Sequence, residues 1–340
     1  MTSYDAVLLL SFGGPEGPDE VMPFLENVTR GRGVPRERLE SVAEHYQHFG
    51  GVSPINGQNR ALIAALRAEL DASDIALPIY WGNRNWHPLV EAAVREMASD
   101  GIRRALVLVT SAYSSYSSCR QYQDDLATAV ALVGETAPEF DKVRHFFDHP
   151  GFIEPQVDAV RASIDPSRRS TTRLVFTAHS IPVSMAALSG PAGNLYVDQL
   201  RAASQLIASQ AGPDLKWDLV FQSRSGPPTV PWLEPDVCDH LRALPAEGVT
   251  DVIVVPVGFV SDHLEVQWDL DVEAAAVATE VGIGFTRTPA PGTDARFIAM
   301  LRELIEERLD PPCPPRALSS LGPSRATCPA GCCPAPARRP

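Results

Sequence analysis

The sequence contains no stretch with the features of a leader or a membrane span. Its first residues, MTSYDAVLLLSFGG, lack the basic residues of a secretory signal, and their apolar run is too short to cross a bilayer. No other apolar segment is long enough to do so. We therefore expect a cytoplasmic protein without an integral membrane segment, in which this first run forms a β-strand.

An excess of positive charge is also absent. The 340 residues carry a formal net charge of −13. Nucleic acids and anionic membranes are bound by basic surfaces, so this charge disfavours both as general partners. A small anionic substrate would need a local basic region, and Arg30, Arg32, Arg36 and Arg38 form the most basic segment of the chain. Because Arg30 lies in a Gly-rich loop, where binding groups are common, it is a candidate ligand contact.

Two widespread catalytic motifs are missing. The Gly13-Gly14 pair that follows the first apolar run is not part of a G-x-G-x-x-G fingerprint, and no phosphate-loop lysine follows it. His179 and Ser180 are adjacent and cannot form the Ser–His pair of a hydrolase, which also needs a nucleophile elbow. Dinucleotide binding by the usual fingerprint and hydrolysis by a triad are therefore disfavoured.

Apolar, β-branched runs alternate with helical patterns along the chain, which predicts an α/β fold. The run that begins at Gly101 matches the one that begins at Gly248 in spacing and apolar character, which favours two similar doubly wound, Rossmann-like lobes with a cleft between them. We predict a first lobe over residues 1–150 that is completed by a C-terminal helix over 293–309, a second lobe over 151–292, and a flexible Pro- and Cys-rich tail over 311–340.

A row of carboxylates follows the most apolar of the predicted strands. Glu265, Asp269 and Glu273 lie at i, i+4 and i+8 of the next predicted helix, directly after the run at 252–260. Acidic residues are also favoured in first helical turns by the helix dipole, which would explain a single one of them. Three like charges at this spacing repel one another, so the row indicates a cation or a proton path at the carboxyl end of a strand.

His179 ends another predicted strand, 173–178, and Pro182 prevents that strand from continuing. A histidine at the carboxyl end of a buried strand is placed as a catalytic group would be, although many histidines there are structural. His179 ends the first strand of the second lobe and Glu265 follows its third. We therefore predict that both side chains face one cleft.

Seven segments together resemble ferrochelatase in its actinobacterial form: LLLSFGGPEGP, HFGGVSPINGQNR, YWGNRNWHP, TSAYSSYSSCRQY, FTAHSIP, FQSRSGPPTVPWLEPD and VPVGFVSDHLEVQWDLDVE. The resemblance covers about residues 4–308. It implies a chelatase-like pair of Rossmann-like domains, a porphyrin cleft between them and insertion of Fe²⁺, as a substrate, into the porphyrin. His179 matches the histidine of the family's HS-[IL]-P motif and Glu265 its essential glutamate, so both are expected to be catalytic and to contact the iron.

The resemblance also implies contacts to the porphyrin. Ser53 and Tyr122 match porphyrin-contact positions of the family, and Arg30 is expected near the mouth of the cleft. Phe12 stands where the firmicute branch often has tyrosine, so it can pack on the macrocycle but cannot ligate iron. Asp269 and Glu273 would provide a path for metal or protons.

The resemblance to the actinobacterial form implies coproporphyrin III as the substrate. Its four propionates need more polar partners than two, and the chain offers Arg30, Arg32, Ser53, Arg120 and Tyr122 for them. The product would be Fe-coproporphyrin III (coproheme), handed over to a separate decarboxylase in haem biosynthesis by a monomeric enzyme. A protoporphyrin IX ferrochelatase and a non-catalytic tetrapyrrole or metal carrier are the alternatives. A carrier would not need a proton acceptor beside a row of carboxylates.

Clustered cysteines indicate metal or redox chemistry, and four of the six, Cys313, Cys328, Cys332 and Cys333, lie in the last thirty residues. Relatives hold a [2Fe–2S] cluster with three tail cysteines and a fourth after the HS-[IL]-P motif, but residues 185–190 contain no cysteine. Adjacent Cys332 and Cys333 are also cramped for one cluster. Cys328, Cys332 and Cys333 could supply tail ligands of such a cluster, with Cys313 a further candidate. We favour the alternative of a Pro-rich tail whose thiols hold no cluster or bind metal loosely, with no required cofactor and with Cys119 and Cys238 as small core or rim residues.

Overall fold

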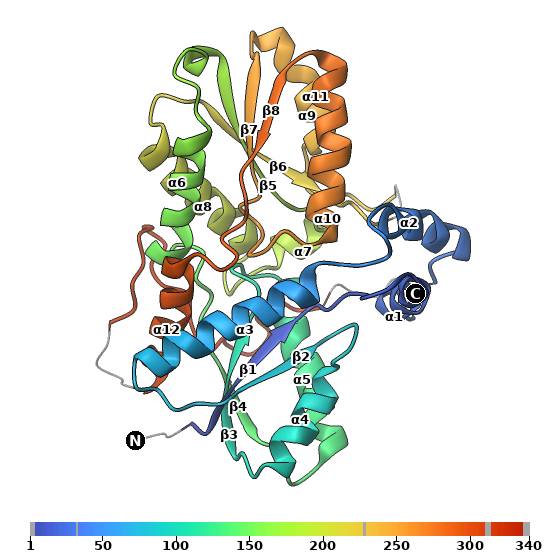
Figure 1. Cartoon of the computed structure of the whole chain (residues 1–340), viewed down its shortest axis with the longest axis vertical. Coiled ribbons are helices and arrows are strands. Elements are labelled where there is room, and N and C mark those ends of the chain that lie inside the picture. The colour runs from blue at the N-terminus through green and yellow to red at the C-terminus, as the bar shows by residue number, and fades with distance from the viewer. Residues whose placement is uncertain (1–3, 32, 227–228, 310–313, 336–340) are drawn as a thin grey trace. The chain divides into compact units, whose positions relative to one another are not determined.

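The computed structural model describes residues 4–31, 33–226, 229–309 and 314–335 (Figure 1). The chain divides into two compact units. The first unit consists of Met1–Thr110, Tyr122–Val143 and Arg308–Pro311, and the second of Ser111–Gln121, Arg144–Glu307 and Pro312–Pro340. Each contains a four-stranded sheet. No described helix has the length and apolar character that crossing a membrane requires.

The sheet of the first unit has the strand order β2-β1-β3-β4, with all neighbours parallel. Its central strand β1 is buried at every position, as its unbroken apolar run predicts for a parallel strand covered on both faces. One face carries Leu8 and Leu10, which pack against α4 and α5. The elements are β1 (Ala6–Ser11), the 3₁₀ turn η1 (Pro18–Glu20), α1 (Val21–Val28), α2 (Arg36–His48), α3 (Ile55–Ala72), β2 (Ile79–Asn83), α4 (Val90–Ser99), β3 (Arg104–Val109), α5 (Gln121–Val133) and β4 (Glu139–Lys142).

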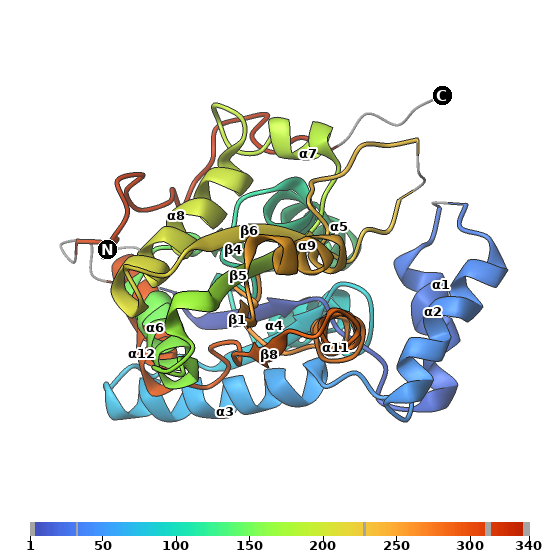
Figure 2. The ribbon, with the colours of Figure 1, turned by 90° about the horizontal axis from the view of Figure 1, so that it is seen from above.

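The sheet of the second unit repeats this arrangement in the order β6-β5-β7-β8, again with all neighbours parallel. Helices α9 and α11 cover one face and α6 and α8 the other (Figure 1, Figure 2). The elements are α6 (Pro150–Ser163), the 3₁₀ turn η3 (Arg169–Thr171), β5 (Thr172–His179), α7 (Val183–Ala187), α8 (Leu195–Ala211), β6 (Trp217–Gln222), α9 (Val237–Ala243), the 3₁₀ turn η4 (Leu244–Glu247), β7 (Asp251–Val255), α10 (Leu264–Val266), the π-helix η5 (Gln267–Ala274), α11 (Ala275–Val281), β8 (Gly284–Arg287) and α12 (Ala295–Leu309). The two matching sheets confirm the predicted α/β fold.

The boundaries of the units differ from the predicted ones at two segments. The last helix, α12, lies in the second unit as far as Glu307, whereas the sequence analysis assigned it to the first lobe. The cause is its apolar face, where the Phe297 ring centroid lies 5.9 Å from that of Phe146 and 6.3 Å from that of Phe152. The segment 111–121, which contains the π-helix η2 (Tyr116–Arg120), also belongs to the second unit. There the Tyr113 hydroxyl donates a hydrogen bond of 2.7 Å to the Val257 carbonyl.

The tail has no helix or strand over residues 314–335, as its prolines predict. It is nevertheless attached to the second unit at several points. The Leu318 amide donates to the Asp148 carbonyl over 3.0 Å, and the Ser319 hydroxyl donates to the Asp148 carboxylate over 2.6 Å. Near its end, Cys332 and Cys333 are both buried. This part of the tail therefore packs as a part of the second unit.

Candidate active site

The structure brings His179 and Glu265 together. His179 is the last residue of β5, and Glu265 lies in α10, which follows β7 after a short loop. Strands β5 and β7 are parallel neighbours, so their carboxyl ends meet at one edge of the sheet. There, Nε2 of His179 lies 3.7 Å from Oε2 of Glu265, and the two side chains are 36% and 45% exposed. The pair is thus held by the sheet and remains open to a ligand.

Hydrogen bonding fixes which nitrogen of His179 faces the glutamate. Nδ1 lies 2.5 Å from the Ser180 carbonyl oxygen. A carbonyl oxygen can only accept, so in the neutral ring the proton is on Nδ1 and Nε2 keeps its lone pair. The Tyr196 hydroxyl holds the backbone by donating to the His179 carbonyl over 2.9 Å. Two acceptor atoms, Nε2 and the Glu265 carboxylate, therefore face each other, an arrangement that favours a proton or a cation between them.

A second imidazole lies beside this pair, and the sequence analysis missed it. His263 precedes α10, and its ring centroid lies 5.1 Å from that of Phe259. Burial lowers the pKa of His263, the charge of Glu265 opposes this shift and that of His179 adds to it. Because the charges of His179 and Glu265 both shift the pKa of His263, its imidazole lies within electrostatic reach of this pair. The signal in the sequence is its position two residues before Glu265, in the same strand-to-helix junction.

The row of carboxylates begins in the short helix α10 with Glu265 and continues on a π-helix, not on one α-helix as predicted. The π-helix η5 begins at Gln267 and carries Asp269 and Glu273. Its i→i+5 hydrogen bonds give a wider turn, which is frequent at functional sites. Glu273 is exposed and accepts a hydrogen bond of 2.9 Å from Nε1 of Trp268. Both Glu265 and Glu273 raise the pKa of Asp269, so the three carboxylates interact as the spacing suggested.

Asp269 is the member of the row whose ionisation is most altered. Burial raises its pKa to about 7, while a hydrogen bond from the Ser223 hydroxyl and one of 3.2 Å from Nε2 of Gln222 oppose the shift. Ser223 has a positive φ of 61°, a conformation that is uncommon for residues other than glycine. Asp269 can therefore gain or lose a proton near neutral pH.

Three of the predicted porphyrin contacts lie around the carboxyl end of β1 in the first unit. Phe12 follows this strand, and its ring centroid lies 6.4 Å from that of Phe24 in an edge-on arrangement. Ser53 is buried, and its amide donates to the Pro15 carbonyl over 2.8 Å. A Cβ on Gly14 would lie 2.6 Å from the Ser53 Cβ, so only glycine permits this approach.

The third of these contacts, Tyr122, is held by its neighbours in the first unit. The Arg84 guanidinium lies over the Tyr122 ring, 4.8 Å from its centroid, and forms an ion pair with Asp125. Burial raises the pKa of Tyr122, and the Arg84 charge opposes this shift. The Arg84 amide donates to the Ser11 carbonyl at the end of β1 over 3.0 Å. Arg30 is exposed beyond α1, and Arg32 lies outside the described residues.

Cys328, Cys332 and Cys333 lie together in the tail, and Cys119 of the segment 111–121 is near enough for its charge to act on Cys332. The sulfurs of Cys332 and Cys333 are 3.8 Å apart. Burial raises the pKa of Cys332, and the neighbouring Cys333 raises it further. A hydrogen bond with Cys328 lowers this pKa, whereas the charge of Cys119 raises it. Cys119 is itself buried in η2. Cys313 lies outside the described residues, and Cys238 packs against the hydrophobic core of the second unit.

This set of thiols fits a [2Fe–2S] cluster, which the sequence analysis did not expect. Two thiolates on one tetrahedral metal ion at about 2.3 Å are about 3.8 Å apart, which is the separation of the Cys332 and Cys333 sulfurs. The positive φ of Cys333, 51°, lets adjacent side chains approach each other. The Gly190 amide donates to the Cys333 sulfur over 3.1 Å, a contact typical of cluster ligands. Cys119 is the internal cysteine whose charge acts on Cys332, whereas residues 185–190 contain no cysteine.

The described residues contain no three His, Cys, Asp or Glu side chains arranged around a single metal ion. A binuclear cluster spreads its four thiolates over two irons, so its ligands need not surround one point.

Comparison with solved structures finds a similar fold in a chelatase and in a chelatase-like protein. SirB from Bacillus subtilis, solved with Fe³⁺, matches with a TM-score of 0.56 and 9% identity over 90% of this chain and 98% of its own. DR2241 from Deinococcus radiodurans, a multi-domain protein described as structurally similar to chelatases, matches with a TM-score of 0.52 and 12% identity over 89% of this chain and 55% of its own. At these identities the likeness shows the fold alone.

Comparison of sequences is more specific. The model of the ferrochelatase family matches residues 4–309, so the chain belongs to the ferrochelatase family. The coproporphyrin III ferrochelatase of Nocardia farcinica is 56% identical over 99% of this chain and 98% of its own length. That of Streptomyces coelicolor is 53% identical over 99% and 95%. The resemblance found in the sequence is thereby confirmed.

Proposed function

We propose that this chain inserts Fe²⁺ into coproporphyrin III to give Fe-coproporphyrin III (coproheme) in haem biosynthesis. The observation that carries the proposal is the pair of acceptors at the carboxyl ends of β5 and β7, where Nε2 of His179 faces the Glu265 carboxylate at 3.7 Å. The names and high identity of the actinobacterial relatives support the choice of reaction and porphyrin.

The proposed reaction exchanges two protons for one ion. Fe²⁺ enters as the two pyrrole N–H protons leave, so the charge of the ring does not change. His179 accepts a proton or contacts the iron through the lone pair of Nε2, and the Glu265 carboxylate stabilises the cation that results. Asp269, with its pKa raised to about 7, can pass protons on, and exposed Glu273 can release them to water.

The porphyrin is bound, in this proposal, by residues of the first unit. Ser53 and Tyr122 provide hydroxyls to propionates, Arg30 provides a positive charge, and the Phe12 ring packs on the macrocycle. Tyr122 is suited to this role because Arg84 and Asp125 hold its ring in one orientation.

We also propose that Cys119, Cys328, Cys332 and Cys333 hold a [2Fe–2S] cluster. Such a group, when bound, is a one-electron redox centre and links its ligand segments covalently. In this chain it would join the tail to the segment 111–121. The chain's own contribution is the burial of Cys119, Cys332 and Cys333 and the amide that Gly190 directs at the Cys333 sulfur.

An anaerobic assay of metal insertion tests the main proposal. Purified protein is mixed with Fe²⁺ and either coproporphyrin III or protoporphyrin IX, and the metalloporphyrin is followed by absorbance. We expect a higher kcat/KM with coproporphyrin III. Equal or better use of protoporphyrin IX would favour the alternative porphyrin, and tight binding without insertion would favour a carrier.

Two finer parts of the proposal concern partners. We propose that the enzyme acts as a monomer. We also propose that it passes coproheme to a decarboxylase, because the product still carries all four propionates. Light scattering of the purified protein measures the first. Transfer of coproheme to an added decarboxylase in the presence of a haem scavenger measures the second.

A further inference from the structure

Gln199 is a buried amide whose two ends contact two segments that carry cysteines. It lies in α8 and is only 1% exposed. Its Oε1 accepts a hydrogen bond of 2.8 Å from the Ser114 amide, and its Nε2 donates one of 3.1 Å to the Ser324 hydroxyl. Both hydrogen-bonding ends of one rigid side chain are therefore used.

The first contact fixes the segment that carries Cys119. Ser114 precedes the π-helix η2, in which Cys119 lies. The start of η2 is capped by Ser115, whose hydroxyl accepts from the Ser118 amide over 3.1 Å. The Ser118 hydroxyl donates back to the Tyr113 carbonyl over 2.8 Å, and the Cys119 amide donates to the Ser115 carbonyl over 3.0 Å. This network of hydrogen bonds therefore fixes Cys119 relative to Ser114.

The second contact fixes the tail shortly before its thiols. Ser324 precedes Cys328 by four residues, so a bound Ser324 confines Cys328 to within about 14 Å of it. Cys332 and Cys333 follow, and their burial shows that this end of the tail is packed. Gln199 thus holds the segment before Cys328 and the segment before Cys119 at the same time.

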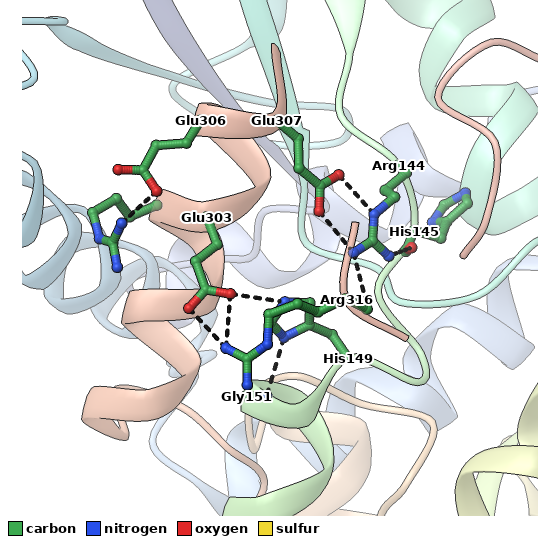
Figure 3. Close-up of polar contacts among 9 residues, drawn as sticks. Arg144, His145, His149, Gly151, Glu303, Glu306, Glu307 and Arg316 are labelled. Carbon is green, nitrogen blue, oxygen red and sulfur yellow. Dashed lines mark hydrogen bonds and ion pairs between the residues drawn. The ribbon is translucent and has the colours of Figure 1, made fainter. Parts of the chain in front are cut away.

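A separate group of polar side chains binds the beginning of the tail to α12 (Figure 3). The Arg316 guanidinium lies 3.0 Å from the Glu303 carboxylate. Arg144 is buried, pairs with Glu307 at 2.8 Å and donates to the Arg316 carbonyl over 2.9 Å. Nε2 of His149 also lies 3.2 Å from Glu303, and burial lowers the pKa of His149 to about 3. The contacts of this cluster anchor residue 316, well before the thiols.

We propose that Gln199 is a positioning residue for the iron–sulfur cluster, which holds the segment of Cys119 and the tail of Cys328, Cys332 and Cys333 in register so that four thiolates converge. The inference rests on the cluster assigned under the proposed function. It predicts that the cluster depends on a side chain that touches no iron ligand directly. Groups that hydrogen-bond to the ligands themselves commonly change the affinity of a metal site about 10-fold or more, and we expect the indirect contact of Gln199 to have an effect at the lower end of this range.

The test compares Gln199→Leu with Gln205→Leu, an identical change at an exposed position of the same helix. Each protein is purified anaerobically, and iron, acid-labile sulfide and the visible and EPR spectra are measured. The rate at which an iron chelator removes the cluster is then followed well below the melting temperature. For Gln199→Leu we expect about tenfold faster loss and enhanced tryptic cleavage after exposed Arg325, with Gln205→Leu behaving as the wild type.

Ser324→Ala keeps the test decisive if Gln199→Leu does not fold, because it removes only the tail end of the bridge. It should also speed the loss of the cluster, by less than Gln199→Leu does. Loss rates equal to that of the wild type in these variants would overturn the proposal. If anaerobically purified wild-type protein contains no iron and sulfide, the proposed cluster is wrong. The proposed insertion of Fe²⁺ into coproporphyrin III is measured separately and would still stand.

Discussion

The two units share one strand order, but the carboxyl ends of their sheets carry different side chains. In the first unit the end of β1 is surrounded by Phe12, Ser53 and Tyr122, which provide a ring, hydroxyl groups and close backbone approach. In the second unit the ends of β5 and β7 carry the acceptors of His179 and Glu265 at 3.7 Å. The same topology therefore supports two kinds of edge, in line with the proposal that the first binds porphyrin and the second carries out proton and metal chemistry.

The largest effect is expected at the pair in the second unit. His179→Ala should lower kcat by at least about 10³-fold, because it removes the lone pair at Nε2, and Glu265→Gln should lower it by about 10²-fold or more. Both variants should stay folded, since each side chain is more than a third exposed. The measurement is single-turnover insertion of Fe²⁺, with circular dichroism as the check of folding.

The matched control is Glu280→Gln, which makes the same change at an exposed position of α11. It should keep wild-type turnover. Turnover by His179→Ala within tenfold of the wild type would remove the division between a binding edge and a chemical edge.

A smaller effect with a defined pH dependence is expected at Asp269. Asp269→Asn should lower kcat about 10- to 100-fold and remove an ionisation near pH 7 from the pH–rate profile. The pKa of the Asp269 carboxyl is raised in the folded state. The native protein therefore binds more protons than the unfolded chain between about pH 4 and pH 7. Its contribution to stability is therefore present at low pH and is lost as the pH rises through about 7.

Melting curves at pH 5 and pH 8 measure the second half of this prediction. The wild type should lose more of its melting temperature over this interval than Asp269→Asn does. An equal loss in both proteins would mean that Asp269 ionises at its ordinary pKa, and the carboxylate row would then be a row of solvated charges.

The first unit should respond in KM and not in kcat. Tyr122→Phe and Ser53→Ala each remove one hydroxyl and should raise KM for coproporphyrin III by about 3- to 10-fold with kcat nearly unchanged. Protoporphyrin IX, with two propionates fewer, should be affected less. Steady-state kinetics on both porphyrins give the comparison, and a selective fall in kcat would show that the first unit also takes part in the chemistry.

The sequence predicted the parts of this molecule that follow from local pattern. The apolar run of β7 and the helix after it predicted the place of Glu265, and the end of the strand at His179 predicted its partner, because parallel strands deliver their carboxyl ends to one edge. The repeated Gly-led apolar run predicted two similar sheets.

What the sequence did not predict depends on contacts between distant segments. Asp269 acquires its raised pKa from burial beside Ser223 and Gln222, which no spacing reveals. Cys119 is buried, as the sequence predicted, but its place beside the tail cysteines depends on segments that lie far apart in the chain. The π-helix η5 was missed since its spacing of carboxylates also suits an α-helix.

The smallest effect is expected at Glu273, at the solvent end of the carboxylate row. Its side chain is exposed and accepts a 2.9 Å hydrogen bond from Nε1 of Trp268. Glu273→Ala should lower kcat only about two- to fivefold, because water replaces an exposed proton carrier more easily than one such as half-buried Asp269, which Ser223 and Gln222 hold by hydrogen bonds. A small exogenous acid or base, such as imidazole, should restore part of the rate. Measured over a range of imidazole concentrations, the variant should approach wild-type kcat while Asp269→Asn does not respond. A rescue of Asp269→Asn and not of Glu273→Ala would reverse the order of the two carboxylates in the path.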